Sequence, residues 1–245
     1  MKVIIITGTS FGLGLSIAKK CLEAGCSVFG IGRSPATLKE TQNLKTSYPS
    51  TFYYQSINLT DSMAPSIILE KCIETFGRVD SIVHNAGIIE PVGKLSDIDL
   101  KEFEELMKIN LFSGLDLVQK SLPQLRQNRG SIIFVSSGAS VKPLHAWGAY
   151  CISKAAINML VAVLGEEEPL VTSIAIRPGV VDTNMQEKIR NDFKNVMLPK
   201  DHQKFVSIKD DATILHPDKP ASAIARFCID PIADKSGQFI SWDQI

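Results

Sequence analysis

Short apolar runs recur along the chain, separated by longer segments of mixed polarity. The first run is rich in isoleucine and shows almost no alternation between apolar and polar positions. Continuous runs of this kind are typical of parallel strands, because helices cover both faces of a parallel sheet. On this pattern we predict seven strands, the last of them weaker than the others: Val3–Thr7, Ser27–Ile31, Phe52–Ile57, Val79–His84, Ser131–Ser136, Thr172–Ile176 and Gln238–Ser241.

Segments of helical length lie between these strands. The fourth is long enough for two helices or one bent helix. Strands that alternate with helices indicate βαβ units with right-handed crossovers. The pattern therefore predicts an α/β protein with one domain over residues 1–245. The expected helices are Gly14–Ala24, Ala36–Tyr48, Ser62–Phe76, Asp99–Gln127 and Ala149–Leu164.

The stretch from Val180 to Lys219 breaks the alternation of strands and helices. It mixes charged residues with apolar ones, among them Met185, Phe193 and Met197. A long irregular segment in a compact domain is usually functional. We interpret residues 180–219 as a substrate lid whose apolar side chains suggest an apolar pocket. The alternative is a surface excursion with small helices of its own.

Composition narrows the classes of function. Lysine and arginine total 26 and aspartate and glutamate total 26, so no net charge attracts nucleic acid or an anionic membrane. No apolar stretch approaches the ~20 residues that span a bilayer. The five cysteines lack CxxC spacing and the histidines lack ligand spacing, which indicates neither a disulfide framework nor a metal site. We expect a cytoplasmic protein with a small-molecule substrate, and neither nucleic acid nor membrane as partner.

A glycine-rich turn directly follows the first predicted strand. Gly8 permits a tight turn, Gly12 lets the backbone approach a pyrophosphate, and Gly14 allows the next helix to pack closely on the strand. The N-terminus of that helix then offers free N–H groups and a positive dipole end to the phosphates. A strand, glycines and a helix in this order at the start of a βαβ unit predict a dinucleotide site.

The end of the second predicted strand bears on the choice between NAD and NADP. A carboxylate there would bind the ribose 2′-hydroxyl of NAD, but the strand ends with Ile31 and Gly32, followed by Arg33. Arg33 lies 19 residues after Gly14, and a guanidinium suits a 2′-phosphate. We therefore predict NADP(H) as the cofactor; the alternative is that Arg33 only faces solvent.

Tyr150 and Lys154 are four residues apart in a predicted helix, so they share one face. A phenol has a pKa of about 10, and a neighbouring ammonium lowers it. We expect this effect to make Tyr150 a general acid towards a carbonyl oxygen. Ser137, at the end of the strand before this helix, can hydrogen-bond the same oxygen.

These motifs together resemble the short-chain dehydrogenase/reductase family over nearly the whole chain. The resemblance rests on six motifs in the family's order and spacing: Thr7-Gly8 with Gly12 and Gly14, Asn85-Ala86-Gly87, Asn110, Ser137 placed 13 residues before Tyr150, Tyr150 with Lys154, and Pro178-Gly179 with Thr183.

The resemblance implies a fold, an assembly and roles for these residues. The fold is a Rossmann-type, doubly wound seven-stranded parallel sheet with helices on both faces, usually in homodimers or homotetramers. Asn110, Ser137, Tyr150 and Lys154 form the implied catalytic tetrad, in which Lys154 also holds the nicotinamide ribose. The implied cofactor residues are Gly8, Ser10, Gly12, Leu13, Gly14, Arg33, Ser34, Asn58, Leu59, Asn85, Ala86, Gly87, Tyr150, Lys154, Pro178, Gly179, Val181 and Thr183.

Three positions depart from the family pattern. Asn58 stands where the family often has aspartate, and its side-chain oxygen can still accept a hydrogen bond from the adenine amino group. Phe11 stands where NADPH-dependent members often carry a basic residue, so only Ser10 and Ser34 are left to assist Arg33. His84 stands where asparagine is common, and we interpret it as a structural histidine whose hydrogen bonds are satisfied.

A narrower likeness links the chain to the fungal benzil reductase and sepiapterin-reductase-like branch. It rests on Glu90-Pro91-Val92, on Trp147 through Tyr150, and on Pro178 through Gln186. The branch implies an NADPH-dependent reductase of apolar or aromatic ketones, including 1,2-dicarbonyls such as benzil, and we expect Trp147 to form an aromatic wall. The alternatives are an NAD(P)-linked alcohol or steroid dehydrogenase and a non-catalytic NADP-binding sensor.

Overall fold

The protein forms one seven-stranded, fully parallel sheet with the strand order β3-β2-β1-β4-β5-β6-β7. The structure is a computed structural model that describes residues 1–245. The predicted fold class is confirmed, and the strand ends differ from prediction by two residues at most. The strands are β1 Val3–Thr7, β2 Ser27–Gly32, β3 Phe52–Ser56, β4 Ser81–His84, β5 Ser131–Val135, β6 Thr172–Arg177 and β7 Gln238–Ser241.

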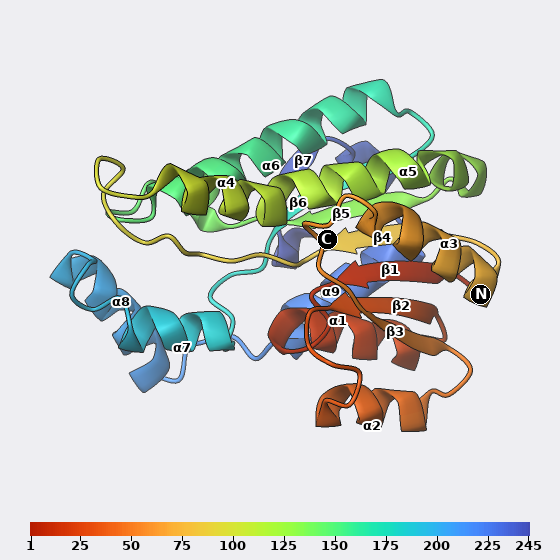
Figure 1. The fold of residues 1–245 in the computed structure, drawn as a ribbon, viewed down its shortest axis with the longest axis horizontal. Coiled ribbons are helices and arrows are strands. Elements are labelled where there is room, and N and C mark those ends of the chain that lie inside the picture. The colour runs from red at the N-terminus through yellow and green to blue at the C-terminus, as the bar shows by residue number, and fades with distance from the viewer.

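Both faces of the sheet are buried, which accounts for the continuous apolar runs. Along β1, Ile4 and Ile6 point into one core while Val3 and Ile5 point into another. Helices α1, α2 and α9 lie on the first face, and α3, α5 and α6 lie on the second (Figure 1). Alternate residues of one strand therefore meet two separate helical layers.

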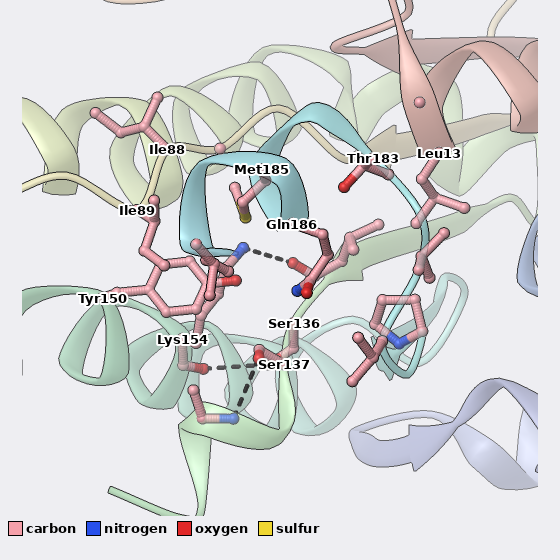
Figure 2. Close-up of a pocket in the computed structure, with 18 of the residues that line it drawn as sticks. Leu13, Ile88, Ile89, Ser136, Ser137, Tyr150, Lys154, Thr183, Met185 and Gln186 are labelled. Atoms are coloured by element: carbon pink, nitrogen blue, oxygen red, sulfur yellow. Dashed lines mark hydrogen bonds between the residues drawn. The ribbon is translucent and has the colours of Figure 1, made fainter. Parts of the chain in front are cut away.

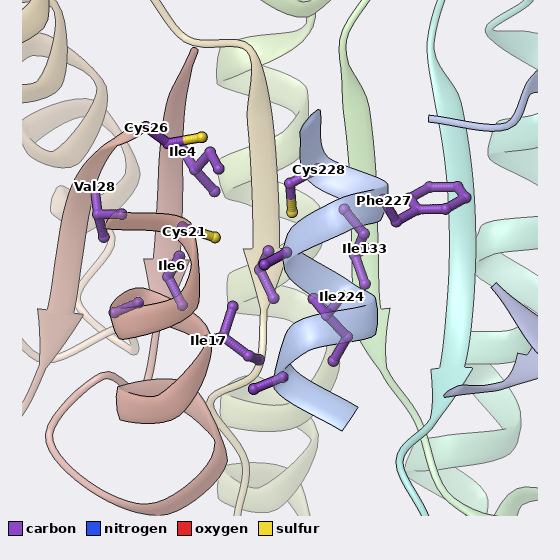
Figure 3. Close-up of a cluster of buried hydrophobic side chains, with 14 of the residues drawn as sticks. Ile4, Ile6, Ile17, Cys21, Cys26, Val28, Ile133, Ile224, Phe227 and Cys228 are labelled. Atoms are coloured by element: carbon purple, nitrogen blue, oxygen red, sulfur yellow. The ribbon is translucent and has the colours of Figure 1, made fainter. Parts of the chain in front are cut away.

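The core under α1 and α9 is built from branched aliphatic side chains and thiols. Figure 3 shows Ile17 and Cys21 of α1 facing Ile224 and Cys228 of α9 on the same side of the sheet. Burial and a hydrogen bond with Cys228 raise the pKa of the Cys21 thiol, so it packs as a small neutral side chain. All five cysteines are free.

The helices follow the predicted ones, with additions in the second half of the chain. Helix α9 was not predicted; Pro220 stands in its first turn, where a missing N–H costs nothing. The α-helices are α1 Gly12–Glu23, α2 Lys39–Ser47, α3 Ala64–Phe76, α4 Leu100–Met107, α5 Ser113–Asn128, α6 Gly148–Glu167, α7 Asn184–Asn191, α8 Pro199–Asp210 and α9 Asp218–Ile229.

The long helical segment predicted over Asp99–Gln127 is resolved into two α-helices and a connecting turn. Asp99 caps α4, its side chain accepting the Lys101 N–H at 2.8 Å. Residues Lys108–Phe112 then form a π-helical turn before α5 continues. Insertions of this kind often mark functional sites, and this one carries Asn110.

Residues 180–219 form an excursion from the sheet that contains two helices, α7 and α8. These helices extend beyond the carboxyl ends of the strands, to the left in Figure 1. A bridge between Val181 and Leu215 closes the base of the excursion. Within it, Asp182 accepts a charged hydrogen bond of 2.7 Å from Lys209.

Helix α6 is long and apolar enough to cross a membrane, contrary to the expectation that no segment is. The fold uses many of these apolar residues itself: Ile157, Val161 and Leu164 are buried in the second core. The same helix carries Tyr150 and Lys154 at its N-terminal end.

Candidate active site

A cavity of about 790 Å³ opens at the carboxyl edge of the sheet. The turns after β1, β4, β5 and β6 line it, together with α6 and α7. Doubly wound sheets bind ligands at this edge, where the strand order reverses, and here it reverses between β1 and β4. Figure 2 shows Met185 and Gln186 of α7 on one side of the cavity and Tyr150, Lys154 and Ser137 on the other.

Most of the predicted site residues meet in this cavity. Those that line it are Gly8, Gly12, Leu13, Arg33, Asn85, Ala86, Gly87, Ser137, Tyr150, Lys154, Pro178, Gly179, Val181 and Thr183. Six others lie outside its lining: Ser10, Gly14, Ser34, Asn58, Leu59 and Asn110.

The glycine turn has the shape that a pyrophosphate requires. Gly12 has a φ of +57°, and a Cβ there would come within 3.0 Å of Thr183 across the cavity. A Cβ on Gly14 would stand 2.2 Å from the Gly8 carbonyl oxygen, so the helix packs on the turn only without a side chain. No side chain caps α1, which leaves its first N–H groups free for an anion. The turn therefore fits a dinucleotide.

The corner near Arg33 is organised by a residue that the sequence analysis missed. The Tyr54 hydroxyl lies 3.0 Å from Ser10 Oγ and donates to the Ser34 carbonyl oxygen at 2.8 Å. Tyr54 thus links Ser10 to the backbone of Ser34, the two serines expected to assist Arg33. Arg33 itself is exposed and lines the cavity. Asn58 is exposed and uses its Oδ1 to accept the Thr60 N–H.

Tyr150 and Lys154 are both almost fully buried, at 7% and 4% exposure. Lys154 Nζ donates to the Val135 carbonyl oxygen at 2.7 Å and lies 5.6 Å from the centroid of the Tyr150 ring. The shared helix face predicted from their spacing therefore brings them together. The β5 backbone holds the ammonium in place.

The expected fall in the pKa of Tyr150 does not occur. Burial raises the pKa of Tyr150 to about 12, and a hydrogen bond with Ser137 acts against that rise. Burial also lowers the pKa of Lys154 to about 8. The expectation weighed the ammonium alone, whereas desolvation disfavours both charged forms. Tyr150 is therefore a neutral phenol with a proton to donate.

Ser137, rather than its neighbour Ser136, belongs with Tyr150. The Ser136 hydroxyl is buried and donates to Asn158 Oδ1 at 2.6 Å. Ser137 Oγ accepts the Ala139 N–H at 3.1 Å and also forms a hydrogen bond with the Tyr150 side chain.

Asn110 is completely buried and acts through the backbone. Its Nδ2 donates to the Ile88 carbonyl oxygen at 2.9 Å and to Ser153 Oγ at 3.0 Å. Its Oδ1 accepts the Ile88 N–H at 2.8 Å. Asn110 therefore clamps the loop after β4 to α6, next to Lys154.

The substrate end of the cavity is apolar. Trp147 lines it as predicted; its ring stacks on Phe205 of α8 at 5.3 Å and meets Tyr150 edge-on at 5.9 Å. Met185 also lines the cavity, whereas Phe193 and Met197 do not. Those two are buried in a small core with Trp147 and Tyr150, so they anchor α7 and α8 to the body.

Several lining residues were not singled out from the sequence. They are Ile88, Ile89, Val141, Lys142, Leu144, Arg177, Lys188, Ile189 and Phe205. Lys188 also forms an ion pair with another lining residue, its Nζ lying 2.5 Å from Glu90 Oε1.

Comparisons with known proteins agree with this geometry. The sequence model of the short chain dehydrogenase family matches residues 2–194. An uncharacterized oxidoreductase of Schizosaccharomyces pombe is 41% identical over 98% of this chain and 96% of its own length. A benzil reductase of Saccharomyces cerevisiae that forms (S)-benzoin is 38% identical over 99% of this chain and 96% of its own.

A solved structure agrees as well. The crystal structure of a short chain dehydrogenase/reductase from Saccharomyces cerevisiae has 34% identity and a TM-score of 0.95, and the match covers 99% of this chain and 96% of that one. The family match, the relatives and the site agree: the chain belongs to the short-chain dehydrogenase/reductase family and is an oxidoreductase acting on CH–OH and C=O groups.

Proposed function

We propose that the protein is an NADPH-dependent carbonyl reductase of apolar or aromatic ketones, 1,2-dicarbonyls such as benzil included. The observation that carries the proposal is the neutral, buried Tyr150 beside Ser137 on the floor of a cavity with apolar walls. The similarity to a benzil reductase over nearly the full chain supports the substrate class.

The proposed reaction divides the work between the cofactor and the side chains. A nicotinamide cofactor, when bound, would supply the hydride for the carbonyl carbon and would be the reductant of the reaction. Tyr150 donates its proton to the carbonyl oxygen, so that C=O becomes CH–OH. Ser137 holds that oxygen through a hydrogen bond, and the Lys154 ammonium stabilises the negative charge left on Tyr150. Asn110 keeps the loop after β4 in place.

The same residues are proposed to hold NADP(H). The glycine turn and the free amides of α1 receive the pyrophosphate, and Arg33 with Ser10 and Ser34 receives the 2′-phosphate. Asn58 and Leu59 lie at the adenine end. The lining residues Asn85, Ala86, Gly87, Pro178, Gly179, Val181 and Thr183 surround the nicotinamide half. We further propose that residues 180–219 act as the substrate lid.

A substrate panel tests the proposal. Benzil, a simple aliphatic ketone and a quinone are each mixed with the purified protein and either NADPH or NADH, and consumption of the reduced cofactor is followed. Reduction of benzil with NADPH supports the proposal. Oxidation of alcohols or steroids without reduction of any ketone favours the dehydrogenase alternative. Tight NADPH binding without turnover in either direction favours the sensor.

The reduction rate should depend on pH through Lys154. Its pKa of about 8 means that the stabilising ammonium is lost as the pH rises through that value, while Tyr150 keeps its proton to about 12. We expect kcat to be level below pH 8 and to fall above it. A pH series at saturating substrate checks this, and a kcat that stays level to pH 10 contradicts it.

We propose that the protein works in the cytoplasm as a homodimer or homotetramer. Ile152, Met159 and Val163 share one face of α6 and expose 43%, 67% and 41% of their surface. A second copy covering this face would remove the apolar patch from water. The small-molecule substrate is its other proposed partner.

Light scattering checks the assembly. We expect wild-type protein to have at least twice the monomer mass, and Met159→Glu to shift it towards the monomer, because a carboxylate cannot be buried unpaired. Met63→Glu is the matched control at another exposed methionine and should leave the mass unchanged. A monomeric wild type rules the assembly out.

A further inference from the structure

His84 is a buried histidine next to the catalytic residues that the proposed reaction does not use. It ends β4 and is 1% exposed. Its ring lies 5.2 Å from that of Phe134, and a Cβ on Gly114 would lie 2.7 Å from its Cγ. The imidazole therefore fills the space that Gly114 leaves open, where the π-helical turn passes into α5.

The hydrogen bonds of Thr7 determine which ring nitrogen carries the proton. Thr7 Oγ1 accepts the N–H groups of Asn85 at 3.1 Å and Ala86 at 3.0 Å, and it lies 3.2 Å from His84 Nδ1. A hydroxyl accepts two hydrogen bonds and donates one. With both acceptor positions filled, the Thr7 proton goes to Nδ1, and the proton of the neutral ring is on Nε2.

The Nε2–H group lies beneath the turn that carries Asn110. Nε2 is buried and has no hydrogen-bond partner, contrary to the expectation of a satisfied histidine. The carbonyl groups of Asn110 and Ile109 lie close enough to act on its pKa. Burial and the charge of Lys154 outweigh them and lower that pKa to about 4, so the ring is neutral at neutral pH.

A shift of this turn would reach the reacting groups. The Asn110 side chain bonds both backbone groups of Ile88 and the hydroxyl of Ser153, and Ser153 donates to the Tyr150 carbonyl oxygen at 2.8 Å. A Cβ on Gly87, beside Ile88, would be 3.5 Å from Lys154 Nζ. The cavity loop and the start of α6 are thus both tied to Asn110.

We propose that His84 is a positioning residue of the reaction, one whose ring packs against Gly114 and directs its Nε2–H towards the carbonyls of the π-helical turn, and so keeps Asn110 in place. Thr7 sets the tautomer, and the same hydroxyl holds the cofactor loop Asn85-Ala86. The nucleotide side and the proton-transfer side of the site are thereby joined through one ring. The inference rests on oxidoreductase activity at Tyr150, whichever carbonyl compound is the substrate.

Two substitutions in the full-length protein separate this role from packing. His84→Phe keeps the ring but removes both nitrogens, and we expect kcat to fall about tenfold while the KM for NADPH stays within about twofold. His84→Gln places an amide N–H at the reach of the lost Nε2, and we expect kcat to return to within about threefold of wild type. The activity assay uses whichever carbonyl compound the wild type reduces best.

Hydrogen exchange supplies a readout that needs neither cofactor nor substrate. In His84→Phe the amides of Lys108–Phe112 should exchange faster than in wild type, and in His84→Gln they should return towards it. Ser121→Ala is the matched control: Ser121 is a buried α5 residue whose hydroxyl has no partner. It should leave kcat and the exchange of the turn unchanged.

Two results would contradict the positioning role of His84. If His84→Phe keeps the wild-type kcat and exchange, or if His84→Gln restores neither, then His84 only packs and the inference is wrong. A wild type that reduces no dicarbonyl would overturn the proposed substrate class instead. In that case the hydrogen-exchange comparison, and the kcat comparison on another substrate, would still test the role of His84.

Discussion

Tyr150→Phe should lose carbonyl reduction almost completely, with kcat about 100-fold to 10,000-fold below wild type. Phenylalanine keeps the ring that meets Trp147 edge-on at 5.9 Å but has no proton to donate. Only the Ser137 hydroxyl would then stabilise the negative charge that develops on the carbonyl oxygen. The measurement is kcat at saturating NADPH together with the Kd for NADPH.

The Kd should stay close to that of wild type, because the glycine turn and Arg33 are untouched. Ser137→Ala is the companion variant, and we expect a smaller loss, since it removes one hydrogen bond and leaves the proton donor. If Tyr150→Phe retains more than about a tenth of the wild-type kcat, then Tyr150 is not the acid. If its unfolding midpoint also falls sharply, the comparison rests on Ser137→Ala.

Arg33→Ala should lower the kcat/KM for NADPH and leave the kcat/KM for NADH nearly unchanged. A hydrogen bond to a charged group contributes about 1.5–3 kcal/mol, so we expect the kcat/KM for NADPH to fall by about tenfold to a hundredfold. The kcat/KM for NADH should change little, because NADH has no 2′-phosphate. Arg33→Asp should widen the difference, because a carboxylate repels that phosphate and can accept the 2′-hydroxyl of NADH.

Arg129→Ala is the matched control, an exposed arginine at the far end of α5 that does not line the cavity. It should leave the kcat/KM for both cofactors unchanged. If the kcat/KM values for NADPH and NADH fall equally in Arg33→Ala, then Arg33 supports the fold of the cavity rim and does not bind the 2′-phosphate. A wild type that already prefers NADH would contradict the NADP(H) assignment directly.

Features determined by local sequence were predictable without the structure. Seven strands and the main helices follow from runs whose length and spacing do not depend on distant residues, as in β1 and α6. Tyr150 and Lys154 share a face because they are four residues apart in a helix. The glycine turn is recognisable because close backbone approach excludes side chains, and a Cβ on Gly14 would indeed collide with the Gly8 carbonyl oxygen.

Features that depend on the surroundings of a side chain, such as its pKa and its packing partners, could be established only from the tertiary structure. The pKa of Tyr150 rises because its ring is buried among residues distant in sequence, and no local pattern records that desolvation. Phe193 and Met197 look like pocket residues in the sequence but pack in a small core, because an apolar side chain does not specify its partner.

The same reason explains Tyr54 and His84. Tyr54 lies 44 residues from Ser10, and His84 lies 77 from Thr7; neither pair belongs to a motif. Their hydrogen bonds exist only because a parallel sheet brings the carboxyl ends of neighbouring strands to one edge. The sequence by itself therefore determined the strands, the main helices and the candidate residues of the chemistry, while the tertiary structure decided their protonation, their supports and the shape of the pocket.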